Sequence, residues 1–367
     1  GNWPISEPLG SGKVATIPAN HTEKPPMTNV MRDCLRTLTE GDMPAVNMIQ
    51  GAFDSIMEGD VSPIQIAAFL TALKLRGERV EDIVAAATVM RQKATTIQAP
   101  ETAMDIVGTG GDGVGTYNIS TATAFVVAGA GVPVAKHGNK AVSSLSGSAD
   151  VLSCLGIKLD CDMAQVSAAL DGAGICFLMA PRHHAAMRHV APVRADLGIR
   201  TIFNSLGPLA NPALVKRIMV GVFDPALCLP FAHALHQLGT THAWVVHGAD
   251  GLDEVSSTGP TKVAALANGA VREFTIAPAD IGIDQVRIDA LRGGTPDENA
   301  ASLRGVLTGD TGPYRDVVLL NAAAALVGGG HEETLITAAE RAADSIADGR
   351  AMATLSRLVA ITNGEAE

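Results

Sequence analysis

Residues 104–121 have the sequence MDIVGTGGDGVGTYNIST, and this stretch indicates the fold more than any other. A short apolar run is followed by five glycines within residues 108–115, and then by polar residues that open an alanine- and valine-rich run. Glycine permits a positive φ and the close approach of a ligand to the backbone. Unpaired N–H groups at the start of a helix attract anions. The pattern therefore predicts a strand, a glycine turn and a hydroxyl-capped helix that cradle a phosphate; the alternative is a tight turn without a ligand.

Short apolar runs alternate with helical patterns along the rest of the chain, which is typical of an α/β protein with a parallel sheet. We expect strands at 105–107, 133–136, 175–179, 217–222, 243–247 and 271–276. We expect helices at 122–130, 149–155, 163–170, 184–194, 226–238, 317–327 and 332–348. Ligands of such sheets collect at the carboxyl ends of the strands, where the glycine stretch lies.

From Asn29 to about Ala94 the chain has a helical pattern throughout, and we expect three amphipathic helices in it. The first begins near residue 42 and ends at Gly59. The second begins with the capping box Ser62-Pro63-Ile64-Gln65, and the third covers about 80–91. Their apolar faces fit either a small domain core or a dimer contact.

We predict two domains, an all-helical domain over 27–98 that is joined by part of 184–212, and a larger α/β domain over 99–367. Residues 1–26 are rich in Gly, Pro, Ser and Asn, and they lack the charged-then-apolar pattern of a signal peptide. We expect them to be a tag or a disordered leader, with Met27 as the native start.

Composition narrows the classes of function. Of the 367 residues, 47% are hydrophobic and 18% are charged, as in a globular protein. The formal net charge of −11 argues against a nucleic-acid-binding protein, which needs a basic face. The five cysteines form no C-x-x-C pair, and no apolar run reaches the roughly 18–20 residues that cross a bilayer. We expect reduced thiols, a cytoplasmic location and no membrane contact.

Two further polar clusters follow predicted strands. Residues 136–140, KHGNK, precede a serine-rich segment at 143–148, and these cations, hydroxyls and glycine N–H groups suit a phosphate. An incidental Ser/Gly loop is the alternative. Residues 248–255, GADGLDEV, place Asp253 next to Glu254, and Mg²⁺ binds through one or two carboxylates plus substrate phosphates. This pair predicts a magnesium-bound polyphosphate, against the alternative of a solvated acidic turn.

A fourth cluster, RHHAAMRHVAPVR, has three arginines and three histidines within residues 182–194. The H-E-x-x-H spacing of zinc sites is absent from it. The planar fork of arginine suits a carboxylate, and a solvated basic helix face is the alternative. The glycine- and proline-punctuated segment 198–212 indicates a hinge or a pocket wall.

Together these motifs resemble the anthranilate phosphoribosyltransferase family in order and spacing, over nearly the whole chain after Met27. The motifs are GTGGD at 108–112, NIST at 118–121, KHGN at 136–139, SGSAD at 146–150, RHVAPVR at 188–194, FNSLGPL at 203–209 and DE at 253–254. The resemblance implies a small helical domain plus a larger α/β domain with a mainly parallel sheet, of the nucleoside phosphorylase/phosphoribosyltransferase type. It also implies a homodimer formed through the helical domain.

The resemblance further implies the reaction and the role of each matching position. Phosphoribose would pass from phosphoribosyl pyrophosphate (PRPP) to the amine of anthranilate, with release of pyrophosphate, in tryptophan biosynthesis. PRPP would contact Gly108, Thr109, Gly110, Gly111, Asp112, Thr116, Asn118, Ser120, Thr121, Lys136, Ser144 and Ser148. Anthranilate would contact Gly108, His137, Asn139, Arg194 and Gly207. Two Mg²⁺ ions would be held by Ser120, Asp253 and Glu254, and the catalytic residues would be Lys136, Asp253 and Glu254.

Two positions depart from the family pattern, since Lys140 stands where arginine is frequent and Leu145 where a basic residue is frequent.

The residue types fit the reaction without a nucleophile or a strong base. Cleavage at the anomeric carbon leaves an oxocarbenium-like centre and a departing pyrophosphate, which need electrostatic stabilisation. One alternative, a pyrimidine nucleoside phosphorylase, would lack the acidic pair. The other, a non-catalytic nucleic-acid-binding relative, would carry a basic surface.

Overall fold

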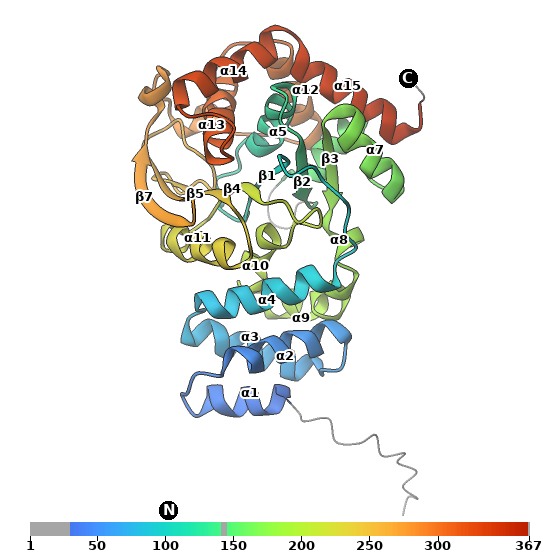
Figure 1. The fold of residues 1–367 in the computed structure, drawn as a ribbon, viewed down its shortest axis with the longest axis vertical. Helices are drawn as coiled ribbons and strands as arrows, with labels where there is room; N and C mark the ends of the chain where they lie inside the picture. Colours follow the sequence, from blue (N-terminus) through green and yellow to red (C-terminus); the bar gives the residue numbers. More distant parts are fainter. Residues whose placement is uncertain (1–29, 141–144, 366–367) are drawn as a thin grey trace, which may run out of the picture.

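The computed structural model describes residues 30–140 and 145–365, and it has a helical part and a larger α/β part (Figure 1). In Figure 1 the helices drawn in blue and cyan lie stacked at one end of the molecule, and a sheet flanked by helices forms the rest. The predicted fold class is therefore confirmed. The leader expected at 1–26 lies outside the described residues. Within the described ranges, no helix has the length and apolar character needed to span a membrane.

A seven-stranded sheet organises the α/β part. Its strands are β1 (Met104–Gly108), β2 (Val134–Gly138), β3 (Ile175–Met179), β4 (Arg217–Gly221), β5 (His242–Gly248), β6 (Thr261–Ala267) and β7 (Ala270–Ile276). Their order is β3-β2-β1-β4-β5-β6-β7. The first five strands in this order run parallel, whereas β6 and β7 pair antiparallel. Five carboxyl ends therefore meet at one edge, where ligands of such sheets bind.

Strand β6 is missing from our predictions, although the sequence carries a signal for it. Asn268 and Gly269 connect β6 to β7 with φ angles of 51° and 73°. Positive φ at both positions is what a two-residue hairpin turn requires, and Asn-Gly is the dipeptide that best provides it. The same dipeptide between two apolar runs predicts a hairpin from sequence alone.

Helices cover both faces of the sheet. In the α/β part the longer ones are α5 (Ile119–Gly129), α6 (Ser148–Cys154), α7 (Met163–Ala173), α11 (Cys228–Gln237), α12 (Pro296–Leu307), α13 (Pro313–Gly328), α14 (Leu335–Ala347) and α15 (Arg350–Asn363). We predicted neither α12 nor α15. Helix α12 begins with a capping box between Thr295 and Glu298 and has Pro296 in its first turn, which is a start signal present in the sequence.

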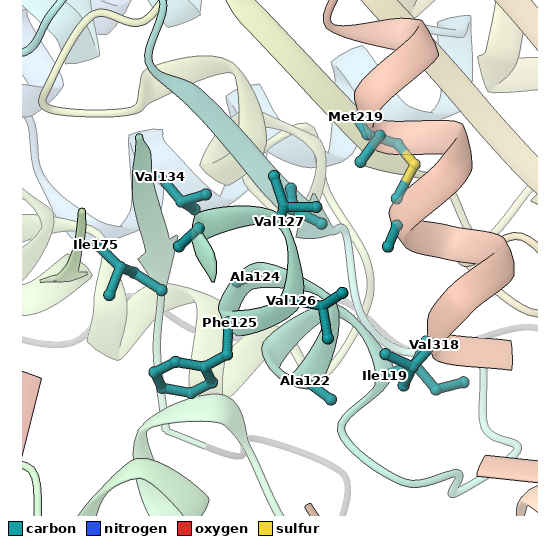
Figure 2. Close-up of a cluster of buried hydrophobic side chains, with 14 of the residues drawn as sticks. Ile119, Ala122, Ala124, Phe125, Val126, Val127, Val134, Ile175, Met219 and Val318 are labelled. Atoms are coloured by element: carbon teal, nitrogen blue, oxygen red, sulfur yellow. The ribbon is translucent and has the colours of Figure 1, made fainter. Parts of the chain in front are cut away.

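Helix α5 lies at the centre of the larger hydrophobic core. Almost all of its residues are buried, as expected for a helix that is apolar on every side. Figure 2 shows it among the strands and α13, and the side chains labelled there include Ile119, Ala122, Phe125, Val126, Val134, Ile175 and Val318. None of these seven is more than 2% exposed. This burial fixes the first turn of α5 relative to the carboxyl ends of β1 and β2.

The helical part contains α1 (Val30–Thr39), α2 (Val46–Glu58), α3 (Pro63–Arg76) and α4 (Val80–Lys93). The three helices that we predicted correspond to α2, α3 and α4, and α1 is an additional one. Gly59 ends α2 with a φ of 83°, and Ser62 and Gln65 form the predicted capping box of α3. The core of this part continues onto the sheet through Val220 of β4 and Val245 of β5. The domain boundary at 98/99 falls between α4 and β1 and stays a prediction.

The single helix predicted at 184–194 is wrong. The chain forms α8 (Ala180–His183), the 3₁₀ helix η1 (Ala185–His189) and α9 (Ala191–Leu197), followed by α10 (Phe203–Leu206) and the 3₁₀ helix η2 (Gly207–Ala210). His184 interrupts the helix with φ −114° and ψ 59°, and Pro192 lies in the first turn of α9, where its missing N–H costs no hydrogen bond. His184 and Arg188 therefore do not lie one turn apart on a helix.

Candidate active site at the carboxyl ends of the strands

The glycine stretch, residues 108–115, begins at the last residue of β1 and lies against an acidic side chain. The N–H of Gly110 donates to Oδ2 of Asp253 at 2.6 Å. A Cβ at Gly108 would lie 2.4 Å from the same oxygen, so any larger residue there would have to displace the Asp253 carboxyl group. Gly110 and Gly111 have φ angles of 71° and 79°, which favour glycine. The turn that we predicted as a phosphate cradle therefore also holds the acidic pair.

Asp253 and Glu254 follow β5 and point into the protein. Asp253 is 8% exposed, and Oε1 of Glu254 accepts a hydrogen bond from the N–H of Ser120 at 3.1 Å. Burial raises the pKa of Asp253, and the neighbouring carboxyl of Asp112 raises it further. Burial also raises the pKa of Glu254, with repulsion from Asp253 added to it and the cation of Lys136 opposing it. A divalent cation would relieve the mutual repulsion of these three carboxylates.

Lys136 places a buried cation beside the acids. Its side chain lies on β2, and its Nζ donates to the carbonyl of Ile106 at 2.7 Å and to Oγ of Ser120 at 3.2 Å. Burial lowers the pKa of Lys136, whereas Asp105 and Glu254 raise it. Because β2 lies next to β1, the lysine reaches across β1 to the first turn of α5. The structure thus brings Lys136, Ser120 and Glu254 together, as the predicted donor site requires.

Magnesium fits this set of residues. Mg²⁺ usually takes one or two carboxylates and keeps waters and substrate phosphates as its other ligands. Within the described ranges, no three Asp, Glu, His or Cys side chains form a ready-made metal site. Buried Asp253 and half-buried Glu254, both with raised pKa values and beside Asp112, therefore fit a metal ion that arrives with a polyphosphate better than a permanently held structural ion.

The start of α5 differs from the predicted hydroxyl-capped helix, and that prediction is wrong. Asn118 precedes the helix, and its side chain makes no cap hydrogen bond. Its amide is used elsewhere: Nδ2 donates to the carbonyl of Ser146 at 3.3 Å, and Oδ1 accepts from Nδ2 of Asn299 at 2.9 Å. Thr121 is buried, and its hydroxyl has no hydrogen-bond partner among the described residues.

Residues from the segment before α12 and from α13 flank the glycine stretch, and we predicted none of them. Thr116 forms an isolated antiparallel bridge with Arg292. Tyr117 and Tyr314, the only tyrosines in the chain, stack with ring centroids 4.2 Å apart and an angle of 15° between the rings. No local sequence pattern marks these partners, because the contacts join residues that are far apart along the chain. Asn118 and Asn299, for example, are 181 positions apart.

The predicted serine loop is described only in part. Ser148 opens α6, and its Oγ donates to the carbonyl of Asn139 at 3.2 Å. Ser144 lies outside the described residues. Of the two departures from the family pattern, Leu145 is 81% exposed, and Lys140 donates its backbone N–H to the side chain of Asn139 at 2.8 Å.

Two neutral histidines lie side by side at the carboxyl end of β2. Nδ1 of His137 is 3.1 Å from the carbonyl of Gly207, so this nitrogen carries the proton and Nε2 is left as an acceptor. His184 faces it, with ring centroids 5.2 Å apart, and the buried Nε2 atoms of both rings have no partner within the described ranges. Burial lowers the pKa of His137 to about 3 and that of His184 to about 4. We did not predict a site role for His184, which we expected only as part of a helix at 184–194.

Two arginines of the segment after η1 differ in their partners. Arg194 on α9 is partly buried and lies 5.8 Å from the ring centroid of Phe203, and it forms no ion pair with any residue that the structure describes. In the same ranges no hydrogen bond joins it to His137 or Asn139. Arg200, which we did not predict, donates to the carbonyl of Gly111 and stacks on Phe223 at 4.0 Å.

Thr109 is tied to the same strand end as Arg200. Its Oγ1 accepts a hydrogen bond from the N–H of Phe223, just past β4, at 3.1 Å. The glycine stretch is therefore held by β4 through Thr109, by the acidic loop through Gly110, and by the segment after α9 through Gly111.

Family models match both parts of the chain. The helical bundle domain of a glycosyl transferase family matches residues 32–94, and the α/β domain of a glycosyl transferase family matches residues 100–352. The anthranilate phosphoribosyltransferase of Parvibaculum lavamentivorans is 56% identical over 328 residues, which cover 89% of this chain and 96% of that protein. The enzyme of the same name from Rhodospirillum rubrum is 52% identical over 345 residues, covering 94% and 99%.

Solved structures agree with these relatives. Anthranilate phosphoribosyltransferase from Thermus thermophilus is 41% identical, with a TM-score of 0.86 and coverage of 90% of this chain and 99% of that one. The Saccharomyces cerevisiae enzyme in complex with PRPP and Mg is 29% identical, with a TM-score of 0.82 and coverage of 92% and 99%. The chain therefore belongs to the anthranilate phosphoribosyltransferase family.

Proposed function

We propose that this chain transfers the 5-phosphoribosyl group from PRPP to the amine of anthranilate, releases pyrophosphate and depends on Mg²⁺, as a step of tryptophan biosynthesis. The observation that carries the proposal is the pair of buried Asp253 and half-buried Glu254, which lies against the glycine stretch and Lys136. The solved S. cerevisiae relatives support it, since one is a complex with PRPP and Mg and another a complex with 4-fluoroanthranilate.

On the donor side, the glycine stretch, the first turn of α5, Lys136 and the serine loop would hold PRPP. Ser120, Asp253 and Glu254 would hold two Mg²⁺ ions. The metal would supply positive charge to the leaving pyrophosphate. Lys136 adds a cation from β2, and its fixed hydrogen bonds mean that little reorganisation is needed as charge develops. The oxocarbenium-like ribose would then be attacked by the amine.

On the acceptor side, Arg194 would bind the carboxylate of anthranilate. Its guanidinium is partly buried and without an ion pair among the described residues, so it is available for a planar, bidentate partner. His137, Asn139, Gly108 and Gly207 would line the same site. The lowered pKa of His137 makes it a poor base, and its free Nε2 would orient the amine by accepting a hydrogen bond.

The helical part would form a homodimer. Helix α3 carries Ile64 and Leu75 at 82% and 83% exposure, with exposed Ala68 between them. Positions 64, 68 and 75 fall on one face of a helix, so they form an apolar stripe that a second copy would cover. We also propose a cytoplasmic location, which fits five free cysteines.

Pyrophosphate release tests the proposal. The pure protein is incubated with PRPP and Mg²⁺, with and without anthranilate, and pyrophosphate is measured by a coupled assay. We expect pyrophosphate to be released only when anthranilate is present, with one pyrophosphate released for each anthranilate consumed. Release without an acceptor would indicate hydrolysis, and phosphorolysis of a pyrimidine nucleoside would indicate the alternative enzyme; either result would overturn the proposal.

A further inference from the structure

The acidic loop between β5 and β6 is fastened to the protein at a point next to the acids. Val255, which directly follows Glu254, is fully buried. The side chain of Asn321 on α13 binds both backbone groups of Val255: Oδ1 accepts from its N–H at 2.9 Å, and Nδ2 donates to its carbonyl at 2.7 Å. A side-chain amide thus pairs with this residue as a neighbouring strand would.

Asn321 is well suited to hold the loop rigidly. It is 0% exposed, and the second hydrogen of Nδ2 donates to the carbonyl of Val317, one turn earlier in α13, at 2.8 Å. Three hydrogen bonds therefore leave the amide one orientation in the core, and a buried network that is fully paired fixes a unique geometry. Helix α13 packs in the large hydrophobic core, which holds Asn321 in place relative to the sheet.

Each acid is also held by its own donor. Asp253 accepts from the N–H of Gly110, and Glu254 accepts from the N–H of Ser120. These two bonds hold the carboxylate ends, whereas Asn321 holds the backbone from which both side chains extend. The two acidic residues are consecutive in the sequence, so a backbone fixed at Val255 keeps both carboxylates where Gly110 and Ser120 bind them.

We propose that Asn321 is a positioning residue that sets the geometry of Asp253 and Glu254 and thereby the affinity of the site for Mg²⁺. The proposal rests on the proposed function in one respect, the assignment of the two acids as metal ligands. Residues that orient metal ligands from behind affect metal affinity by about 10- to 100-fold. We expect an effect of this size when the two hydrogen bonds between Asn321 and Val255 are removed.

Two variants and a matched control separate positioning from folding. Asn321→Leu keeps the branching at Cγ, puts two larger methyl groups in place of the amide oxygen and nitrogen, and removes all three hydrogen bonds. Asn321→Ser is milder, because a helical serine hydroxyl bonds to the carbonyl one turn earlier, which here is Val317, while the contacts with Val255 are lost. Ser345→Ala is the control: it removes one buried side-chain hydrogen bond, from α14 to the carbonyl of Val126 at 2.8 Å, that involves no residue of the acidic loop.

The readout is binding of Mn²⁺ in place of Mg²⁺, followed by the electron paramagnetic resonance of the free ion. The full chain is used with PRPP and without anthranilate, so no turnover takes place. We expect both Asn321 variants to bind Mn²⁺ about 10- to 100-fold more weakly than the wild type, and Ser345→Ala to bind it unchanged. The Mg²⁺ concentration for half-maximal rate should rise in parallel, with the KM for anthranilate unaffected.

Unchanged Mn²⁺ affinity in folded Asn321→Ser would overturn the proposal, as would an equal loss in Ser345→Ala. Melting curves establish which variants are folded, and Asn321→Ser decides the question where Asn321→Leu does not fold. The proposed function fails separately, if the wild type binds Mn²⁺ with PRPP and leaves anthranilate unconverted. Absence of Mn²⁺ binding by the wild type would contradict the metal assignment and the role of Asn321 together.

Discussion

A methyl group at position 108 tests how closely the glycine stretch and the acidic pair are packed. In Gly108→Ala the new Cβ would lie 2.4 Å from Oδ2 and 2.9 Å from Cγ of Asp253. The first distance is about 1 Å shorter than an ordinary contact. Gly108 is not among the residues with positive φ, so alanine introduces no backbone strain of its own. The carboxyl group must therefore turn away, and it loses its 2.6 Å hydrogen bond from Gly110.

The cost follows from the bond that is lost. A hydrogen bond to a charged group contributes about 1.5–3 kcal/mol. Since about 1.4 kcal/mol corresponds to a factor of ten, we expect kcat/KM for PRPP to fall about 10- to 150-fold. The Mg²⁺ requirement should rise as well, because Asp253 is a proposed metal ligand. The KM for anthranilate should change less.

Steady-state rates from anthranilate fluorescence, with PRPP, Mg²⁺ and anthranilate varied in turn, give these constants. Gly259→Ala is the matched control, because a Cβ at that position meets nothing within 4 Å and Gly259 also lacks a positive φ. The two variants should differ in PRPP and Mg²⁺ dependence while both remain folded. Equal constants for Gly108→Ala and Gly259→Ala would refute the close packing of Asp253 against β1.

Three further predictions concern the acceptor side, the metal and pH. Arg194→Ala should raise the KM for anthranilate much more than the KM for PRPP, and equal effects on both would exclude its role with the carboxylate. Replacing Asp253 and Glu254 together by alanine should abolish turnover; full activity with unchanged Mg²⁺ dependence would contradict the metal site. His137 has a folded-state pKa of about 3, lowered mainly by burial and further by His184, His183 and Lys136, against an ordinary 6.5. The unfolded chain therefore takes up this proton first, so the stability contributed by neutral His137 is present above pH 6.5 and lost as pH falls towards 3. His137→Asn should flatten the fall in Tm below pH 6.5, and superimposable Tm curves would contradict this.

The alternation of short apolar runs and helical patterns is enough to predict most of the sheet, because parallel strands are continuous apolar runs that end in polar loops. Gly108 and Asp253 could both be predicted at strand ends for this reason. Two missed elements have clear local signals in hindsight: Asn268-Gly269 marks the hairpin of β6, and the Thr295–Glu298 capping box marks the start of α12.

Other parts of the site have no such signal. His184 and Arg200 lie in a segment that the sequence pattern describes as a single helix followed by a hinge, whereas Pro192 and the conformation of His184 divide it and turn His184 towards His137. Asn299 and Asn321 lie inside helical patterns, where an asparagine is usually predicted to be exposed to solvent. Their burial and partners follow from packing of α12 and α13 against distant segments, which a local pattern does not contain.

The most direct test of the account follows the fluorescence of anthranilate after the addition of PRPP and Mg²⁺ to the pure, folded protein. We expect a loss of fluorescence that requires both additions and that is matched by pyrophosphate release. The loss should be abolished by chelation of the metal and restored by added Mg²⁺. Unchanged fluorescence under these conditions would contradict the central claim that the glycine stretch, Lys136 and the buried acidic pair form a magnesium-dependent phosphoribosyl transfer site.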